Sequence, residues 1–293
     1  MELVLAIDIG ASKISCGLVD AAGTVLAVRR VKTPVDRGAD GVFDALRNAI
    51  RGTLQDGIAG DYPSPVACGI GSVGPMESGG AKVSPLNIPS WKDFPLLARV
   101  EDLTGLPTAI DNDAKALALG EGWVGGARGV MDYISMVVST GVGGGIVLGG
   151  KLLDGHGGNA GHIGHVIVVP DGRRCACGAY GCLEAEASGT AIQAITGRHP
   201  SEASAGTIER TGMLVGLAVA SVANLLDLQL CTIAGSVALG YGKRFFDAAN
   251  RELAVRSRIS YAAKARIEPC GLGAEGPLVG AGAVGWRGIG RLG

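Results

Sequence analysis

Apolar runs separated by short glycine turns open the chain and predict strands. The runs cover residues 3–9, 14–19 and 24–31, and Gly10 and residues 21–23 are the turns between them. Connections this short join antiparallel neighbours, so we expect a three-stranded meander.

Helical spacing and further strands then alternate. Val42, Leu46, Ile50 and Leu54 recur every four residues and predict a helix over 41–58. The elements predicted after it are a buried strand over 66–70, a strand over 108–110 and a helix over 114–121. The alternation is typical of an α/β fold.

The opening pattern returns in the second half of the chain. A strand over 133–139, a glycine turn over 140–144 and strands over 145–148 and after Gly150 repeat it. The remaining predictions are helices over 184–196, 206–226 and 278–286 and a strand over 231–234. We therefore predict two similar α/β lobes, with the two glycine turns face to face across a cleft.

Composition restricts the partners of such a fold. The chain has 293 residues, of which 47% are hydrophobic, and its formal net charge is -1. A large core is therefore possible, and no basic surface for nucleic acid is expected. The 50 glycines far exceed the usual share of about 7%, and their clusters predict tight turns or ligand loops.

No membrane or secretory segment is predicted. No basic region precedes the first strand, and the apolar stretch 213–228 is shorter than the roughly 18 residues of a span and carries Asn224 and Asp227. We expect a buried helix there and a reducing, cytoplasmic compartment, in which disulfides among the seven cysteines are disfavoured.

Four candidate metal ligands lie close together in the sequence: His165, Cys175, Cys177 and Cys182. Three thiolates and one imidazole can close a tetrahedral Zn²⁺ shell, and the glycines between them permit the sharp bends. A closed shell predicts a structural metal. The alternative is three core thiols and an unrelated histidine.

Two glycine turns are candidates for phosphate binding. At the first, Asp8, Gly10, Ser12 and Lys13 provide a carboxylate for Mg²⁺, backbone amides, a hydroxyl and a charge. The second contains Thr140, Gly141 and Gly143. Two such turns suggest a clamped polyphosphate, although each alone can be an ordinary hairpin turn.

Asp113 stands where a predicted strand ends and a helix begins. A carboxylate at a helix N-terminus stays ionised and can align and deprotonate an attacking hydroxyl in phosphoryl transfer. The alternative is a plain helix cap by this residue or by Asn112.

Taken together, these segments resemble the ROK family (repressors, open reading frames, kinases) over almost the whole chain. The matching stretches read DIGASK, SPLNIPSW, IDNDA, STGVGGG and GHIGH…CACGAYGCLEAEASG. The resemblance implies a two-lobed actin-like or hexokinase-like (ribonuclease H-like) ATPase fold with an inter-lobe cleft. Residues 1–115 and the C-terminal helix 276–293 are expected to form one lobe, and residues 116–275, with the zinc loop, the other.

The resemblance also implies an ATP-dependent sugar kinase that uses Mg²⁺ and forms a homodimer. It makes Asp113 the catalytic base. It assigns sugar hydroxyls to Asn87, Asn112, His165 and Glu184, zinc to His165, Cys175, Cys177 and Cys182, and the adenosine to the vicinity of Gly235 and Ser236.

Two positions depart from the family pattern. Ala11 and Ser12 replace a Gly-Thr pair, which affects fine geometry only. His162 replaces a glutamate common in ROK glucokinases, and the resulting GHIGH is similar to bacterial N-acetylmannosamine kinases. We therefore expect N-acetylmannosamine as the substrate, with glucose or N-acetylglucosamine as alternatives; His162 can also be purely structural.

The family also contains sugar-responsive regulators. Because Met1 is followed at once by the first strand, we expect no N-terminal helix-turn-helix and favour the enzyme.

Overall fold

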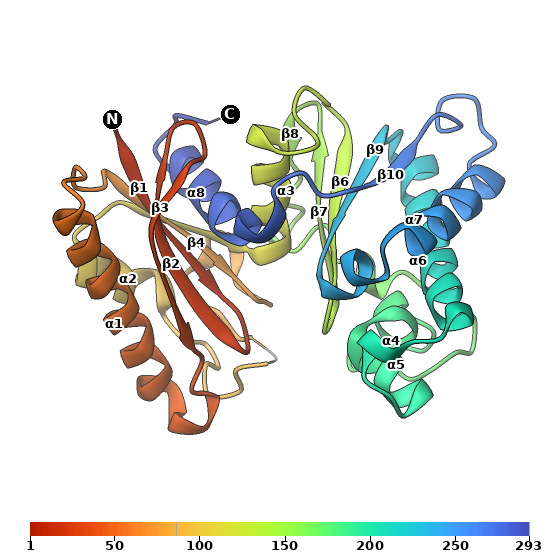
Figure 1. Ribbon diagram of the computed structural model, residues 1–293, viewed down its shortest axis with the longest axis horizontal. Helices are drawn as coiled ribbons and strands as arrows, with labels where there is room; N and C mark the ends of the chain where they lie inside the picture. The colour runs from red at the N-terminus through yellow and green to blue at the C-terminus, as the bar shows by residue number, and fades with distance from the viewer. Residues whose placement is uncertain (86, 293) are drawn as a thin grey trace. The chain divides into compact units, whose positions relative to one another are not determined.

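The computed structural model describes residues 1–85 and 87–292, whose helices and strands are drawn in Figure 1. Their contacts divide the chain into two compact units. The first unit comprises Met1–Gly125, Asp154–Ala160 and Leu272–Gly293, and the second comprises Gly126–Leu153 and Gly161–Gly271.

A five-stranded sheet in the order β3–β2–β1–β4–β5 forms the centre of the first unit. Its strands are β1 (Leu3–Ile9), β2 (Lys13–Asp20), β3 (Val25–Lys32), β4 (Ala67–Ser72) and β5 (Thr108–Asn112). The first three form the predicted antiparallel meander, and β4 and β5 continue parallel to β1. Parallel neighbours need crossovers, which contain α1 (Gly38–Ala59) and α2 (Leu96–Thr104). Short 3₁₀ helices, η1 (Val35–Arg37) and η2 (Ser78–Gly80), accompany them.

The alternation of side chains along β1 decides which face Asp8 joins. Leu3, Leu5 and the other odd-numbered residues pack in the core with α1, whereas Val4 and Ala6 pack on the opposite face with α8 (Gly276–Gly288). Figure 1 shows α1 and α8 on opposite faces of this sheet. Asp8 continues the even-numbered series at the carboxyl end of the strand. Its side chain therefore lies on the α8 face.

Glycines bring α8 unusually close to its neighbours. A Cβ on Gly69 of β4 would lie 2.0 Å from the Ala281 carbonyl oxygen, and one on Gly280 would lie 2.6 Å from that of Ala116. Backbone therefore packs directly on backbone. The prediction that glycine clusters mark turns or ligand loops is wrong for this helix.

Helix α3 (Asp113–Val124) lies within the first unit. A division at residue 115 would cut this helix, which packs along α8. The first unit therefore extends to Gly125, ten residues beyond the predicted lobe, and it also contains Asp154–Ala160 and the short η5 (Gly273–Glu275).

The second unit repeats the topology of the first. Its sheet order is β10–β9–β6–β7–β8, with β6 (Tyr133–Val138), β7 (Val142–Leu148), β8 (Lys151–Leu152), β9 (Leu230–Ala234) and β10 (Arg266–Pro269). Again a meander of three antiparallel strands continues into two parallel ones. The predicted similarity of the two halves is confirmed at the level of strand order and direction.

The helices of the second unit differ from the predicted ones in two places. Those described are α4 (Leu183–Ala187), α5 (Gly189–Thr196), α6 (Ala205–Leu226) and α7 (Ser236–Arg256), with η3 (Ile163–His165) and η4 (Pro200–Glu202). The single helix predicted over 184–196 is broken because Ser188 is extended and its hydroxyl caps α5 at the Ala191 N–H. Like α2 and β10, α7 was not predicted; two glycines interrupt its apolar pattern.

Helix α6 is the only described helix long and apolar enough to cross a membrane by length and composition. Half of its most apolar stretch of 18 residues is buried inside the unit. Gly212 and Gly216 pack against the backbone of α7, so the helix belongs to the core, as predicted for this stretch.

Candidate active site and metal centre

The β1–β2 turn holds the first predicted phosphate site. Hydrogen bonds fix its backbone: the Gly10 N–H donates to the Lys13 carbonyl at 3.0 Å, and the Thr33 N–H donates to the Ser12 carbonyl at 3.1 Å. The Thr33 hydroxyl also donates to the Gly10 carbonyl, at 2.8 Å. The side chains of Ser12 and Lys13 are exposed, so a hydroxyl and an ammonium are available at a rigid turn.

Ala11 fits this turn without strain. The described residues with positive φ include neither Gly10 nor Ala11. Since the turn needs no left-handed backbone here, replacing a glycine by alanine leaves its conformation accessible.

Asn112 and Asp113 lie at the junction of β5 and α3. Asn112 is the N-cap, with an extended backbone and a side-chain oxygen that accepts the Ala114 N–H at 3.0 Å. Asp113 takes the first helical position and accepts the same N–H at 2.8 Å. The capping role that the sequence left open therefore falls chiefly to Asn112.

The Asp8 and Asp113 carboxyl groups interact electrostatically. Burial, and next the Asp113 charge, raise the pKa of Asp8 from 3.8 to about 7, although Lys13 and Arg30 act in the opposite direction. Burial also raises the pKa of Asp113, opposed by its backbone hydrogen bond with Ala114. Two carboxylates that are unfavourable together can share a proton or bind a divalent cation.

Lys115 was not singled out in the sequence, yet it is the most enclosed cation near this junction, with 3% of its side chain exposed. Its ammonium contacts Asp111 at 3.0 Å and Asp154 at 2.8 Å, and donates to the Gly158 carbonyl at 3.1 Å. It thereby ties the Asp154–Ala160 segment to α3. No local pattern indicates the contacts with Asp154 and Gly158, because these residues are 39 and 43 positions away in the sequence.

The predicted sugar ligands are distributed over both units. Asn87 is exposed in the loop before α2, and Asn112 is half-buried, both in the first unit. His162, His165 and Glu184 belong to the second unit.

The second glycine turn is shorter than predicted. The Ser139 N–H donates to the Gly141 carbonyl at 2.9 Å, and β7 begins at Val142. Gly143 pairs with Val137 inside the sheet, so the predicted turn over 140–144 is wrong at its carboxyl end. Glycine has no side chain to mark strand faces, which hid the start of β7 in the sequence.

Glu184 and the start of α5 pack against this turn. Glu184 Oε2 accepts the Val142 N–H at 2.9 Å, and a Cβ on Gly141 would lie 2.8 Å from the same oxygen. The Gly189 N–H donates to the Ser139 carbonyl at 2.7 Å. The segment after the last cysteine thus holds the second turn in place, a contact that spacing did not reveal.

A hollow of about 320 Å³ opens beside this turn within the second unit. Its lining includes Thr140, Thr190, Gln193, His199, Ser236 and Tyr241. The hydroxyls of Ser139 and Ser236 lie 3.0 Å apart, and Gly235 has φ +101° with room for no side chain against the Val138 carbonyl. The volume is at the lower end of small-molecule sites, and the lining mixes hydroxyls with an aromatic ring. Two predicted nucleotide residues, Thr140 and Ser236, thus border the same pocket.

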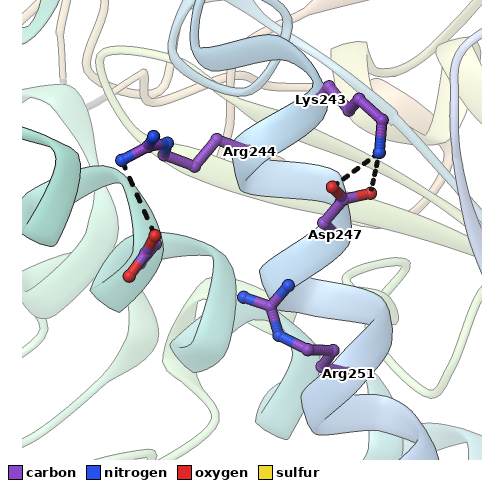
Figure 2. A pocket seen from close by; sticks show the side chains of 5 residues that line it. Lys243, Arg244, Asp247 and Arg251 are labelled. Carbon is purple, nitrogen blue, oxygen red and sulfur yellow. Dashed lines mark hydrogen bonds and ion pairs between the residues drawn. The ribbon is translucent and has the colours of Figure 1, made fainter.

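A second hollow, of about 360 Å³, lies between α6 and α7 and has a different character. Charged side chains line it: Glu209, Lys243, Arg244, Asp247 and Arg251 (Figure 2). Lys243 pairs with Asp247 at 2.7 Å and Arg244 with Glu209 at 3.7 Å. Because four of these five charges compensate each other in pairs at the surface, its larger volume does not make it the better nucleotide site.

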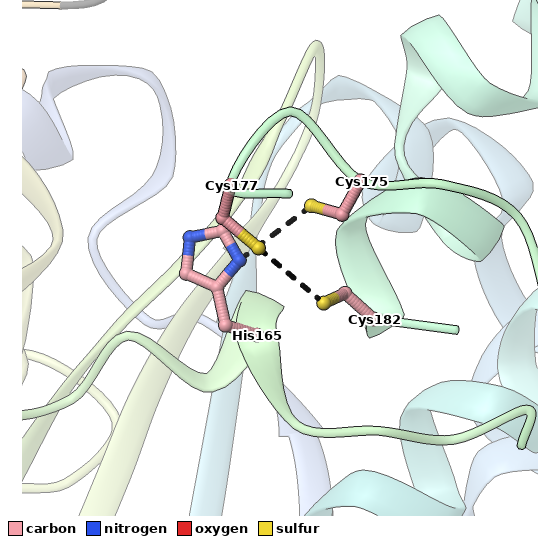
Figure 3. A group of neighbouring side chains, drawn as sticks. All are labelled: His165, Cys175, Cys177 and Cys182. Carbon is pink, nitrogen blue, oxygen red and sulfur yellow. Dashed lines mark hydrogen bonds between the residues drawn. The ribbon is translucent and has the colours of Figure 1, made fainter. Parts of the chain in front are cut away.

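The four predicted metal ligands converge in space (Figure 3). Their ligand atoms all lie within 4.8 Å of one another. The sulfurs of Cys177 and Cys182 are 3.7 Å apart, and Cys175 Sγ is 3.7 Å from His165 Nδ1. A tetrahedral shell with Zn–S of about 2.3 Å places two sulfurs about 3.8 Å apart, which matches this spacing. Burial and the two neighbouring thiols raise the pKa of Cys182 to about 12, because three thiolates this close together repel one another unless a cation lies between them.

The two histidines of GHIGH lie side by side. Their ring centroids are 6.1 Å apart and both side chains are exposed. His165 directs Nδ1 toward Cys175, which leaves Nε2 on the other side of the ring.

Fold and site together define an α/β protein of the hexokinase-like class. The sequence model of the ROK family matches residues 4–284, nearly the whole chain. The chain belongs to the ROK family.

Its relatives include two kinds of sugar kinase. An N-acetylmannosamine kinase of Escherichia coli is 38% identical over 254 residues, which cover 81% of this chain and 84% of that protein. A glucokinase of Streptomyces coelicolor is 37% identical over 217 residues, which cover 74% of this chain and 65% of that protein. The match thus spans just under two thirds of the glucokinase.

A solved structure with the same fold is the ROK glucokinase of Streptomyces griseus in complex with glucose and AMPPNP. It is 31% identical, covers 97% of this chain and 99% of its own, and superposes with a TM-score of 0.83. The two-lobed actin-like fold expected from the sequence is confirmed.

Proposed function

We propose that this chain is an ATP-dependent sugar kinase that phosphorylates the 6-hydroxyl of a hexose. The observation that carries the proposal is the pair of Asp8 and Asp113 carboxyls beside the Lys13 turn, which combines a candidate base with a candidate magnesium ligand. Family membership and the kinases among the relatives support it.

In the proposed reaction, the bond between O6 and the γ-phosphorus forms as the bond from that phosphorus to the leaving ADP oxygen breaks. The O6 proton passes to the Asp113 carboxylate. Burial raises the pKa of Asp113, which makes it a better proton acceptor than an exposed aspartate.

The remaining groups of the first turn would handle the phosphates. Asp8 would hold Mg²⁺ directly or through water, and the ion supplies positive charge to the phosphate oxygens. The turn amides, the Ser12 hydroxyl and the Lys13 ammonium offer further contacts.

In the second unit, Thr140 and Gly141 would bind phosphate, and the pocket lined by Ser236, the residue after Gly235, would take the adenosine. Gly143 is left out because it is a strand residue. We propose that His165, Cys175, Cys177 and Cys182 hold a structural Zn²⁺, with the metal on His165 Nδ1 and its Nε2 available to a sugar hydroxyl.

Among hexoses we propose N-acetylmannosamine. The support is the exposed imidazole of His162 beside His165, where a carboxylate is common in glucokinases, together with the E. coli relative. Glucose is the alternative, supported by the Streptomyces relative.

A coupled ADP-release assay over glucose, mannose, N-acetylglucosamine and N-acetylmannosamine tests the reaction and its specificity together. Asp113→Asn should lower kcat by about 10²–10⁴-fold while sugar binding, measured by calorimetry, is retained. Asp102→Asn, an exposed carboxylate of α2, is the matched control and should be unaffected. Near-normal turnover by Asp113→Asn would remove the base assignment.

The homodimer stays a prediction from the family resemblance, and the cytoplasmic location stays a prediction from the sequence. Sedimentation of the purified chain checks the first.

A further inference from the structure

Glu186 is a buried acid that the proposed reaction does not use. It lies in α4, two residues after Glu184, and 3% of its side chain is exposed. A buried carboxylate requires partners. Oε1 accepts the Arg173 N–H at 2.7 Å, and Oε2 accepts from Arg210 Nη2 of α6 at 2.5 Å.

The surroundings are shaped to admit this carboxylate. A Cβ on Gly172 would lie 2.6 Å from Glu186 Oε1, so the carboxylate occupies the space that a side chain at position 172 would fill. Arg210 also donates from Nη1 to the Glu186 carbonyl at 3.0 Å. The Arg210 guanidinium therefore donates hydrogen bonds to both the side chain and the backbone carbonyl of Glu186 in α4.

These contacts join the two ends of the metal loop, which we define as residues 173–182. Arg173 is its first residue, two before Cys175, and α4 begins directly after Cys182. The Gly181 N–H closes the same loop by donating to the Arg173 carbonyl at 2.9 Å. A loop whose ends are already fixed loses less conformational entropy when its thiolates gather around a cation.

We propose that Glu186 and Arg210 are a positioning pair that arranges the metal loop for Zn²⁺ binding. The inference rests on the proposed zinc site. It concerns groups that touch no metal ligand atom, yet outer residues of this kind typically change metal affinity by about 10–100-fold.

Four variants separate the possibilities. Arg210→Met leaves the buried Glu186 charge unpaired and should weaken zinc binding most, by roughly 100-fold. Glu186→Gln keeps an oxygen that can accept the Arg173 N–H but places the amide NH₂ group opposite Arg210. We expect zinc affinity to fall about tenfold. The double variant removes both charges and should recover to within about tenfold of the wild type, because the amide no longer faces a cation. Glu209→Gln, next to Arg210 on exposed α6 surface, is the control and should bind as the wild type does.

The zinc dissociation constant of the whole chain is measured by competition with a chromophoric chelator, at a temperature at which each variant is still folded. Thermal unfolding is recorded in parallel. A merely structural pair would lower the melting temperature and leave zinc affinity within twofold in every variant, and that result would overturn the inference. If Arg210→Met fails to fold, Arg210→Lys takes its place. This variant keeps the charge but loses the two-pronged guanidinium that contacts both Glu186 groups, and it should still bind zinc more weakly than the wild type.

The same titration keeps this inference distinct from the proposal on which it rests. A wild-type chain that binds no zinc would remove the metal centre itself. A wild type that binds one zinc beside variants of equal affinity would remove only the positioning role.

Discussion

Because Asp8 is buried, its ionisation should lower the stability of the folded chain as the pH rises. Its pKa is raised by burial from 3.8 to about 7 in the folded chain. Below pH 3.8 the group is protonated in both states and contributes nothing. Between pH 3.8 and 7 the unfolded chain releases the proton that the folded chain keeps, so stability falls as the pH rises. Above pH 7 the loss is constant, at about 4 kcal/mol.

Asp8→Asn removes this titration. The free energy of unfolding of the variant, relative to the wild type, should therefore increase by about 2–3 kcal/mol between pH 5 and pH 8. Comparing the two proteins at two pH values cancels any pH-independent change in stability caused by replacing the carboxyl group with an amide. The gain should be lost when Mg²⁺ and a non-hydrolysable ATP analogue are added, since the cation favours the ionised aspartate, and turnover should be abolished.

Urea unfolding followed by tryptophan fluorescence is the suitable assay. The three tryptophans, Trp91, Trp123 and Trp286, all lie in the first unit, so the signal reports the unit that contains Asp8. Asp102→Asn serves as the exposed control. Parallel pH profiles for Asp8→Asn and the wild type would show that Asp8 is ionised normally, and the argument from burial would be refuted.

Three further predictions follow from the site. Lys115→Met removes the nearer of two cations beside buried Asp111, the other being Arg287 at 3.8 Å, and should destabilise the first unit by up to about 3–5 kcal/mol in the same fluorescence assay; a loss below about 1 kcal/mol would contradict the inferred clamp. His162→Glu should lower the ratio of kcat/KM for N-acetylmannosamine over glucose by about tenfold or more, and an unchanged ratio would count against His162 as a specificity residue. Removing the proposed zinc with a chelator should raise the KM for sugar more than that for ATP, because Glu184 follows the metal loop directly; equal changes would argue for general unfolding of the second unit.

Local patterns were sufficient for the features that depend on near neighbours in the chain. The meander of residues 3–31, the Asp8 turn, the strand-to-helix junction at Asp113 and the four candidate metal ligands were all predicted from the sequence. The candidate ligands could be recognised because they lie within one short stretch of sequence, so spacing alone limits their geometry. Family resemblance added the fold and the expected roles.

Weak patterns failed where glycine or an alternative hydrogen bond intervened. The glycines of β7 hid the start of a strand, whereas the helix over 278–286 was predicted despite its glycines, which serve close backbone packing. Ser188 divided a predicted helix because its hydroxyl satisfies the backbone that the helix would have bonded.

By itself, then, the sequence determined that strands and helices alternate in two similar halves and which side chains are candidate ligands and acids, because these follow from periodicity and short spacing. Only the tertiary structure decided how those side chains behave. The raised pKa of Asp8, the partners of Lys115 and the Glu186–Arg210 pair depend on burial and on contacts between residues far apart in the chain. Desolvation and charge pairing act through space, so no local pattern of residues reports them.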